Sequence, residues 1–130
     1  MHADAHRWNE VTRAVIGCSY TVANTLEPGF LEKVYENALA HELRSNGLAV
    51  EQQKALKVYY RDIVVGDYTA HLLVEDLIVV ELKAVRAFDD IHLAQCLNCL
   101  NYLKATGLKV GLLINFGARK VQIKRVVNSF

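Results

Sequence analysis

The segment that most constrains the fold is the apolar run LKVGLLINFG at residues 108–117. It is too short for a membrane-spanning helix, which needs about 20 apolar residues, and it predicts a β-strand buried on both faces. A second apolar segment, LIVVELKAV at residues 77–85, predicts another strand. With helical patterns before and between these strands, the sequence predicts an α/β sandwich around a mixed sheet.

The helices are predicted from apolar residues at helical spacing and from capping residues. The first helix covers about residues 5–26. Pro28 suits the first turn of a second helix that runs to about Ser45. A third helix begins at Asp90 or the preceding aspartate and ends near Thr106.

The remaining strands are predicted at residues 50–62, 64–75 and 120–127 from apolar alternation bounded by turn residues. The predicted order is therefore ααβββαββ, in one domain that spans residues 1–130.

Composition favours a soluble globular protein. Hydrophobic residues make up 52% and charged residues 22% of the chain. Three cysteines make a disulfide framework unfavourable, and the first ten residues lack the pattern of a signal peptide. We therefore expect a cytoplasmic protein without a membrane span.

Charge is distributed unevenly along the chain. The first 90 residues carry nine Lys/Arg and fourteen Asp/Glu, whereas residues 91–130 carry six basic residues and no acidic ones. This pattern is typical of a solvated basic face, or of a face that contacts nucleic-acid phosphates. The six residues are Lys104, Lys109, Arg119, Lys120, Lys124 and Arg125.

Polar residues interrupt two of the predicted strands. Glu81 and Lys83 are two positions apart and therefore share one face of a strand. His71 lies ten residues before Glu81, and the two face each other across a hairpin only if its loop has odd length, such as Glu75-Asp76-Leu77. The spacing allows a cluster of His71, Glu81 and Lys83 without requiring it.

A carboxylate and a lysine on one face suit phosphodiester hydrolysis. The carboxylate holds Mg²⁺ or Mn²⁺, and the lysine positions a water or stabilises charge on phosphorus. The alternative is an ordinary Glu–Lys pair on a solvated strand, which contributes little to stability.

Three motifs in order resemble the bacterial GxxExxY proteins, a family similar to the PD-(D/E)XK nuclease superfamily. They are Gly29-x-x-Glu32-x-x-Tyr35, the segment VVELKAV and the segment YLKATGLKVGLLINFG, and the resemblance covers about residues 15–127. It implies a restriction-endonuclease-like α/β fold.

The resemblance also implies roles for single residues. Glu32 and Glu81 correspond to metal ligands, Lys83 to the catalytic lysine, and Gln95 to a glutamine that some exonucleases carry. His71 stands where the family's principal metal ligand, an aspartate, is expected.

The histidine at this position leaves three outcomes open. Mg²⁺ prefers oxygen ligands, so an imidazole favours a softer metal such as Mn²⁺, Zn²⁺ or Fe²⁺. Alternatively Glu75 or Glu32 compensates for the missing carboxylate, or metal-dependent cleavage is lost.

Further residues are predicted to support the pocket. Tyr35 and Glu42 lie on the second helix, where Glu42 falls near the middle of the apolar face and needs a hydrogen-bonding partner or a place in the pocket. On the third helix, His92, Gln95, Cys99 and Tyr102 form one stripe. Cys96 and Cys99 have the spacing of a metal or redox motif, but small core-facing thiols are the better interpretation.

The sequence therefore predicts a metal-dependent nuclease-like protein that acts on DNA or RNA, attenuated by His71. The alternative is a catalytically inactive module on the same fold, which binds nucleic acid or assembles with copies of itself.

Overall fold

The computed structural model describes residues 2–86 and 90–128, with the side chains of residues 2–5, 90–95 and 98 outside this description. Its elements follow the predicted order. They are α1 (His2–Leu26), α2 (Glu32–Ser45), β1 (Val50–Tyr60), β2 (Ile63–Val74), β3 (Ile78–Lys83), α3 (Asp90–Thr106), β4 (Val110–Asn115) and β5 (Gln122–Val127).

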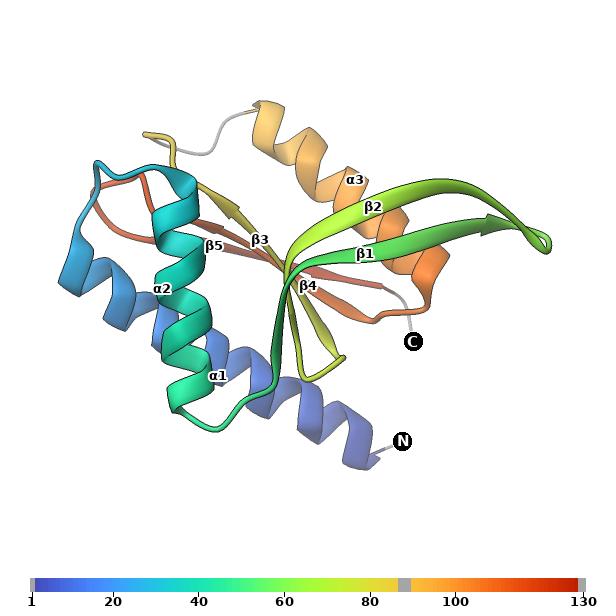
Figure 1. Cartoon of the computed structure of the whole chain (residues 1–130), viewed down its shortest axis with the longest axis horizontal. Helices are drawn as coiled ribbons and strands as arrows, with labels where there is room; N and C mark the ends of the chain where they lie inside the picture. The colour runs from blue at the N-terminus through green and yellow to red at the C-terminus, as the bar shows by residue number, and fades with distance from the viewer. Residues whose placement is uncertain (1, 87–89, 129–130) are drawn as a thin grey trace.

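The strands form one five-stranded mixed sheet in the order β1-β2-β3-β4-β5. The pair β3–β4 is parallel and is connected through α3, while the other neighbours are antiparallel. Helices α1 and α2 cover one face of the sheet and α3 covers the other (Figure 1). This is the predicted α/β sandwich.

The burial of β4 explains its almost entirely apolar sequence, VGLLIN, in which Asn115 is the polar exception. Each of its six residues is buried. Val110, Leu112 and Ile114 join the core beneath α1 and α2. On the other face, a Cβ added at Gly111 would lie 2.9 Å from the Cys99 sulfur, so a larger residue there would require the Cys99 side chain to shift. The prediction of a strand buried on both faces is confirmed.

The entry to α2 differs from the prediction. Pro28 precedes the helix, which begins at Glu32 with no side-chain cap at its N-terminus. Gly29 has a φ of +124°, a conformation that favours glycine. The Tyr35 hydroxyl donates a hydrogen bond to the Glu27 carbonyl and accepts one from the Phe30 N–H. The buried tyrosine, rather than the proline, therefore organises this turn.

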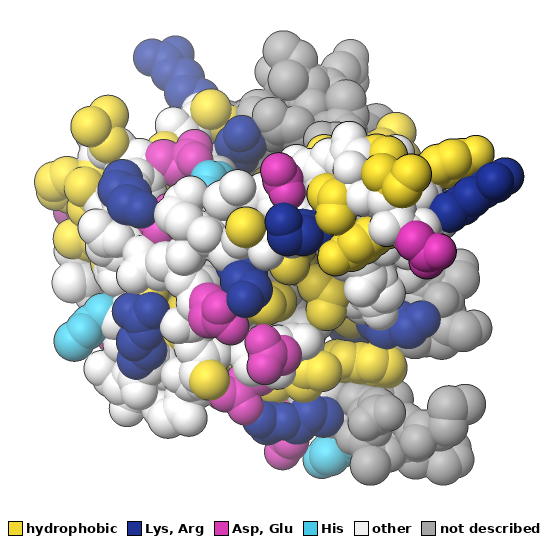
Figure 2. All heavy atoms as spheres, turned by 45° about the vertical axis from the view of Figure 1, so that its right-hand side comes forward, with side chains coloured by type: hydrophobic (Ala, Val, Ile, Leu, Met, Phe, Trp, Pro, Cys, Tyr) yellow, Lys and Arg dark blue, Asp and Glu magenta, His cyan; other side chains and the backbone are white. Residues whose placement is uncertain are grey.

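Strands β1 and β2 form a long hairpin that extends beyond the body of the sheet (Figure 1). Its tip, residues 59–65, carries exposed apolar side chains. Figure 2 shows hydrophobic side chains gathered over this hairpin, while acidic and basic side chains alternate across the rest of that face. Among the described residues, no helix has the length and apolar character that a membrane span requires.

Candidate functional site

Three polar side chains from α2, β2 and β3 meet at the base of the hairpin. The Nε2 atom of His71 lies 3.2 Å from a Glu32 carboxylate oxygen, and its Nδ1 atom lies 3.1 Å from a Glu81 carboxylate oxygen. We call Glu32, His71 and Glu81 the His71 cluster. Sequence reasoning selected all three residues, and the structure brings them together.

The strand register explains this meeting. The β2–β3 loop is Glu75-Asp76-Leu77, because Val74 pairs with Ile78 and Leu72 with Val80. An odd loop of three residues is therefore confirmed. His71 and Glu81 occupy the next pair of opposed positions after Leu72 and Val80, so their side chains extend from the same side of the sheet.

The two carboxylates raise the pKa of His71. The hydrogen bond to Glu81 is the largest cause, partial burial opposes it, and the negative charges of Glu81, Glu32 and Glu36 add to it. The Nδ1 atom also accepts a hydrogen bond of 2.8 Å from the Leu82 N–H. A protonated ring donates to both carboxylates, whereas a neutral ring can accept from Leu82 and still donate to Glu32.

Two tyrosines connect the cluster to α3. The Tyr68 hydroxyl donates a short hydrogen bond to the second carboxylate oxygen of Glu81. Its ring stacks on Tyr102, with centroids 3.9 Å apart and planes inclined by 11°. Burial raises the pKa of Tyr68, and the adjacent Glu81 raises it further. Tyr102 therefore reaches the cluster through Tyr68, a residue that sequence reasoning missed.

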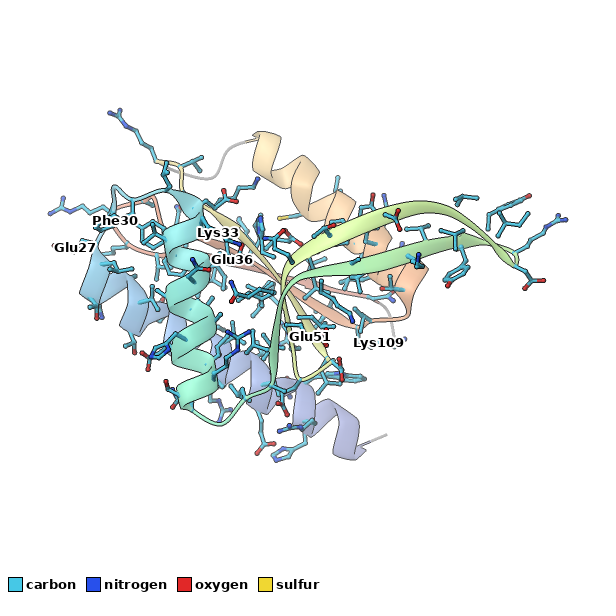
Figure 3. All side chains as sticks on the ribbon, viewed as in Figure 1. Glu27, Phe30, Lys33, Glu36, Glu51 and Lys109 are labelled. Atoms are coloured by element: carbon cyan, nitrogen blue, oxygen red, sulfur yellow. The ribbon has the colours of Figure 1, made fainter. Side chains whose placement is uncertain are left out.

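Glu36 was also missed, although it is the buried glutamate of α2, with 2% of its surface exposed. Its carboxylate accepts hydrogen bonds from Lys33, Gln52 and Gln53. Burial alone would raise the pKa of Glu36, but these three donors hold it below its usual range. Figure 3 shows Glu36 on the side of α2 that faces the hairpin. The available signal was its position four residues after Glu32, on the same helical face.

Glu42 lies away from the cluster. The inward face of α2 is rotated from the predicted one, because Tyr35 and Leu39 are buried as expected while the rest of the buried face is Glu36, Ala40 and Leu43. The predicted apolar face comprised Phe30, Leu31, Val34, Tyr35, Ala38 and Leu39, and the first three are exposed. Ten residues after Glu32, Glu42 is about 15 Å further along the helix. Its carboxylate accepts a hydrogen bond of 3.4 Å from the Asn46 side chain. The structure therefore assigns it the hydrogen-bonding partner that was expected, not a place in the pocket.

Glu75 does not compensate for the missing aspartate. It lies in the β2–β3 loop, four strand residues or about 13 Å from His71. There it forms an ion pair with Arg7 and accepts a hydrogen bond from the Ala49 N–H. The carboxylate is therefore used to hold α1 and β1 at the opposite end of β3.

Lys83 lies two residues beyond Glu81 on the same strand and is half-buried. The structure records no hydrogen bond or ion pair between its ammonium group and the residues it describes, so this cation is available to a ligand. The side chains of Gln95 and His92 lie outside the described residues, and their predicted roles stay predictions.

Cys99 is a buried core residue. Its side chain packs with Ala70, Val79 and Leu103 beneath α3. Burial raises the pKa of its thiol to about 12, with smaller contributions from Glu81 and Cys96. The interpretation of Cys99 as a core-facing thiol is confirmed.

The six basic residues near the C-terminus do not form one face. Lys104 and Lys109 precede β4, whereas Arg119 and Lys120 follow it, about 20 Å away across six strand residues. Lys124 and Arg125 are adjacent on β5 and therefore point to opposite sides. The six residues therefore lie on different parts of the surface, and their predicted contact with nucleic-acid phosphates stays a prediction.

The cluster does not fit the metal that the sequence motifs imply. The two ring nitrogens of His71 contact different carboxylates. A single metal ion can bind only one of these two nitrogens. Both oxygens of Glu81 already interact with protein groups, Tyr68 and His71. Among the side chains that the structure describes, which leave out those of residues 2–5, 90–95 and 98, no group of three His, Cys, Asp or Glu residues is arranged to hold a metal ion. Mg²⁺ is usually bound through one or two carboxylates with waters and substrate phosphates, and here both carboxylates contact the His71 ring.

The fold is that of a restriction-endonuclease-like protein. A model of the PD-(D/E)XK nuclease superfamily matches residues 9–126, and the chain belongs to that superfamily. A solved structure described as "Crystal structure of SSO0001" is similar in fold, with a TM-score of 0.57 and 14% sequence identity. The match covers 76% of this chain and 51% of that one, so this chain spans about half its length. No curated protein matches the sequence.

Proposed function

We propose that this chain is a nucleic-acid-binding domain of the GxxExxY type, in which Mg²⁺-dependent hydrolysis of DNA or RNA is strongly attenuated. The observation that carries the proposal is the position of the His71 ring between Glu32 and Glu81. In a nuclease of this superfamily, a divalent ion bound by carboxylates would stabilise charge on the phosphate.

The ring affects metal binding in two ways. It removes the carboxylate that the motif predicts at this position, so the pocket has one negative charge fewer. It also contacts both remaining carboxylates, so a metal ion has to displace the ring before either glutamate is free to bind it. Both effects lower the affinity for Mg²⁺.

A second candidate function is cleavage with a softer metal such as Mn²⁺. The observation that favours it is the retained pair of Glu81 and Lys83, which share one face of β3. Imidazole is a better ligand for Mn²⁺ than for Mg²⁺.

Cleavage assays test the proposal directly. Labelled single- and double-stranded DNA and RNA are incubated with Mg²⁺ or Mn²⁺ and wild type, Glu81→Ala, Lys83→Ala or His71→Asp protein. We expect little cleavage by wild type in Mg²⁺ and at least a tenfold increase in His71→Asp. Cleavage by wild type in Mn²⁺ that Glu81→Ala abolishes would support the second candidate.

Two results would overturn the proposal. Efficient wild-type cleavage in Mg²⁺ that depends on Glu81 would show that the ring does not attenuate the site. Absence of nucleic-acid binding in gel-shift assays, together with a large assembly by light scattering, would instead favour a self-assembling module.

A further inference from the structure

A hollow, separate from the His71 cluster, lies between the end of α1, the α1–α2 connection and the β4–β5 loop, which are adjacent in Figure 1. Its volume is about 340 Å³, within the usual range for small-ligand sites. We call it the loop pocket. Its lining includes Tyr20, Asn24, Pro28, Phe116, Arg119 and Lys120.

The charge of the loop pocket is positive. Arg119 and Lys120 are both exposed, and no acidic residue in the described part of the chain lines the hollow. The structure records no ion pair between either cation and the residues it describes. Two neighbouring cations without carboxylate partners favour an anionic ligand, and a guanidinium group can bind a phosphate through two hydrogen bonds.

The walls of the loop pocket are apolar and aromatic. Tyr20 is 49% exposed, so its ring is available for stacking. Phe116 is almost fully buried, because it stacks on Tyr35 with ring centroids 5.0 Å apart and planes inclined by 2°. An aromatic side chain beside two cations suits a ligand with a planar ring and a phosphate, the composition of a nucleotide.

The loop that carries the cations is held in place at its base. The Asn115 side chain accepts hydrogen bonds from the N–H groups of Val85 and Gly117, and donates one to the Val85 carbonyl. A Cβ added at Gly117 would lie 2.3 Å from the Val85 nitrogen, so the two chain segments are in close contact. This fixed base lowers the entropy cost of ligand binding at Arg119 and Lys120.

The loop pocket lies beside the expected catalytic edge of the sheet. The Phe116 N–H donates a 2.8 Å hydrogen bond to the Lys83 carbonyl, where the parallel strands β3 and β4 both end. Ligands in α/β sheets bind at the carboxyl ends of such strands.

We propose that the loop pocket binds one nucleotide unit, with the phosphate at Arg119 and Lys120 and the base against Tyr20. The nucleotide is either a free mononucleotide or the terminal unit of a single strand. The strand-end form rests on the nucleic-acid binding proposed above, whereas binding of a free mononucleotide does not.

Isothermal titration calorimetry of the full chain tests this site. The probes are AMP, UMP, inorganic phosphate, and a short oligothymidylate with or without a 5′-phosphate. We expect AMP and UMP to bind at least tenfold more tightly than phosphate. The double variant Arg119→Ala/Lys120→Ala should weaken binding at least tenfold, and Tyr20→Ala about fivefold or more. The control Lys57→Ala removes an exposed cation on the hairpin and should leave binding unchanged.

The outcomes separate the two proposals. Equal affinity for phosphate and nucleotides, no detectable nucleotide binding, or equal loss in Lys57→Ala would overturn the loop pocket as a nucleotide site. Preference for the 5′-phosphorylated strand over AMP and UMP identifies a strand end, and the reverse preference identifies a free nucleotide. Failure of strand binding in wild type with intact AMP binding would overturn only the function proposed for the His71 cluster.

Discussion

The His71 cluster and the loop pocket use charge in opposite ways. In the cluster, an imidazole lies between two carboxylates and a tyrosine occupies the remaining oxygen of Glu81, so the polar groups satisfy one another. In the loop pocket, Arg119 and Lys120 face a hollow whose lining, among the residues the structure describes, contains no acidic side chain. In the cluster, which carries the recognisable motif, the polar groups are therefore paired with one another. In the loop pocket, which carries no motif, the two cations are available to bind a ligand.

Tyr35 supports both regions, so its removal is the largest predicted effect. It is fully buried, stacks on Phe116 and closes the turn before Glu32. We expect Tyr35→Ala to lower the free energy of unfolding by about 3–5 kcal/mol, as for other large-to-small aromatic substitutions. Urea unfolding followed by circular dichroism measures this.

Tyr20→Ala is the matched control, because this exposed tyrosine should cost less than about 1 kcal/mol. Equal losses in the two variants would contradict the role of Tyr35 as a shared support.

His71→Asp replaces the imidazole of the cluster with a third carboxylate, so the cluster, like the loop pocket, then has like charges without an opposite partner. Three carboxylates then face one another without a cation, and we expect a loss of roughly 1–3 kcal/mol in metal-free buffer. Mg²⁺ or Mn²⁺ should restore stability to the variant, because a cation relieves the repulsion, and should change wild type much less.

Thermal unfolding with and without metal measures this effect, and Asp62→Asn at the exposed hairpin turn is the control. An equal metal-dependent shift in wild type would show that the cluster already accepts a metal ion.

The pH dependence of stability tests the internal pairing. Because the pKa of His71 is raised in the folded state, its charge stabilises the protein fully below about pH 6.5. This contribution is lost as pH rises through the folded-state pKa. The groups that face the ring are Glu32, Glu36, Glu81 and Tyr68.

We therefore expect the difference in unfolding free energy between wild type and His71→Ala to shrink as the pH is raised above about 6.5. A difference that stays constant over that range would mean that the ring is neutral throughout.

The smallest predicted effect on stability comes from the loop pocket. Arg119→Ala/Lys120→Ala should change the free energy of unfolding by less than about 0.5 kcal/mol, because both side chains are exposed and make no recorded ion pair with described residues. Chemical denaturation beside nucleotide titration measures both properties. A clear loss of stability would mean that the two cations stabilise the fold and are not available to bind a ligand.

Local patterns predicted the elements that carry one dominant signal. The apolar run of β4 predicted burial on both faces, and the odd spacing of the β2–β3 loop allowed His71 to face Glu81. The start of α2 was wrong, because a proline suits a first helical turn but does not require one. The actual turn depends on Tyr35, whose partners are backbone groups five and eight residues earlier.

The sequence by itself determined the order of elements and the buried strand, since these follow from periodicity. It pointed to Glu32, His71 and Glu81 through a family resemblance, while their spacing allowed but did not require a cluster. The tertiary structure decided which glutamate is buried, because the inward face of α2 depends on how that helix packs between α1 and β1. It also decided that Glu36 is satisfied by Gln52 and Gln53 from β1, and that Arg119 and Lys120 border a hollow with Tyr20. These contacts join residues that are far apart in the chain, and a local sequence pattern does not determine which distant residues come together.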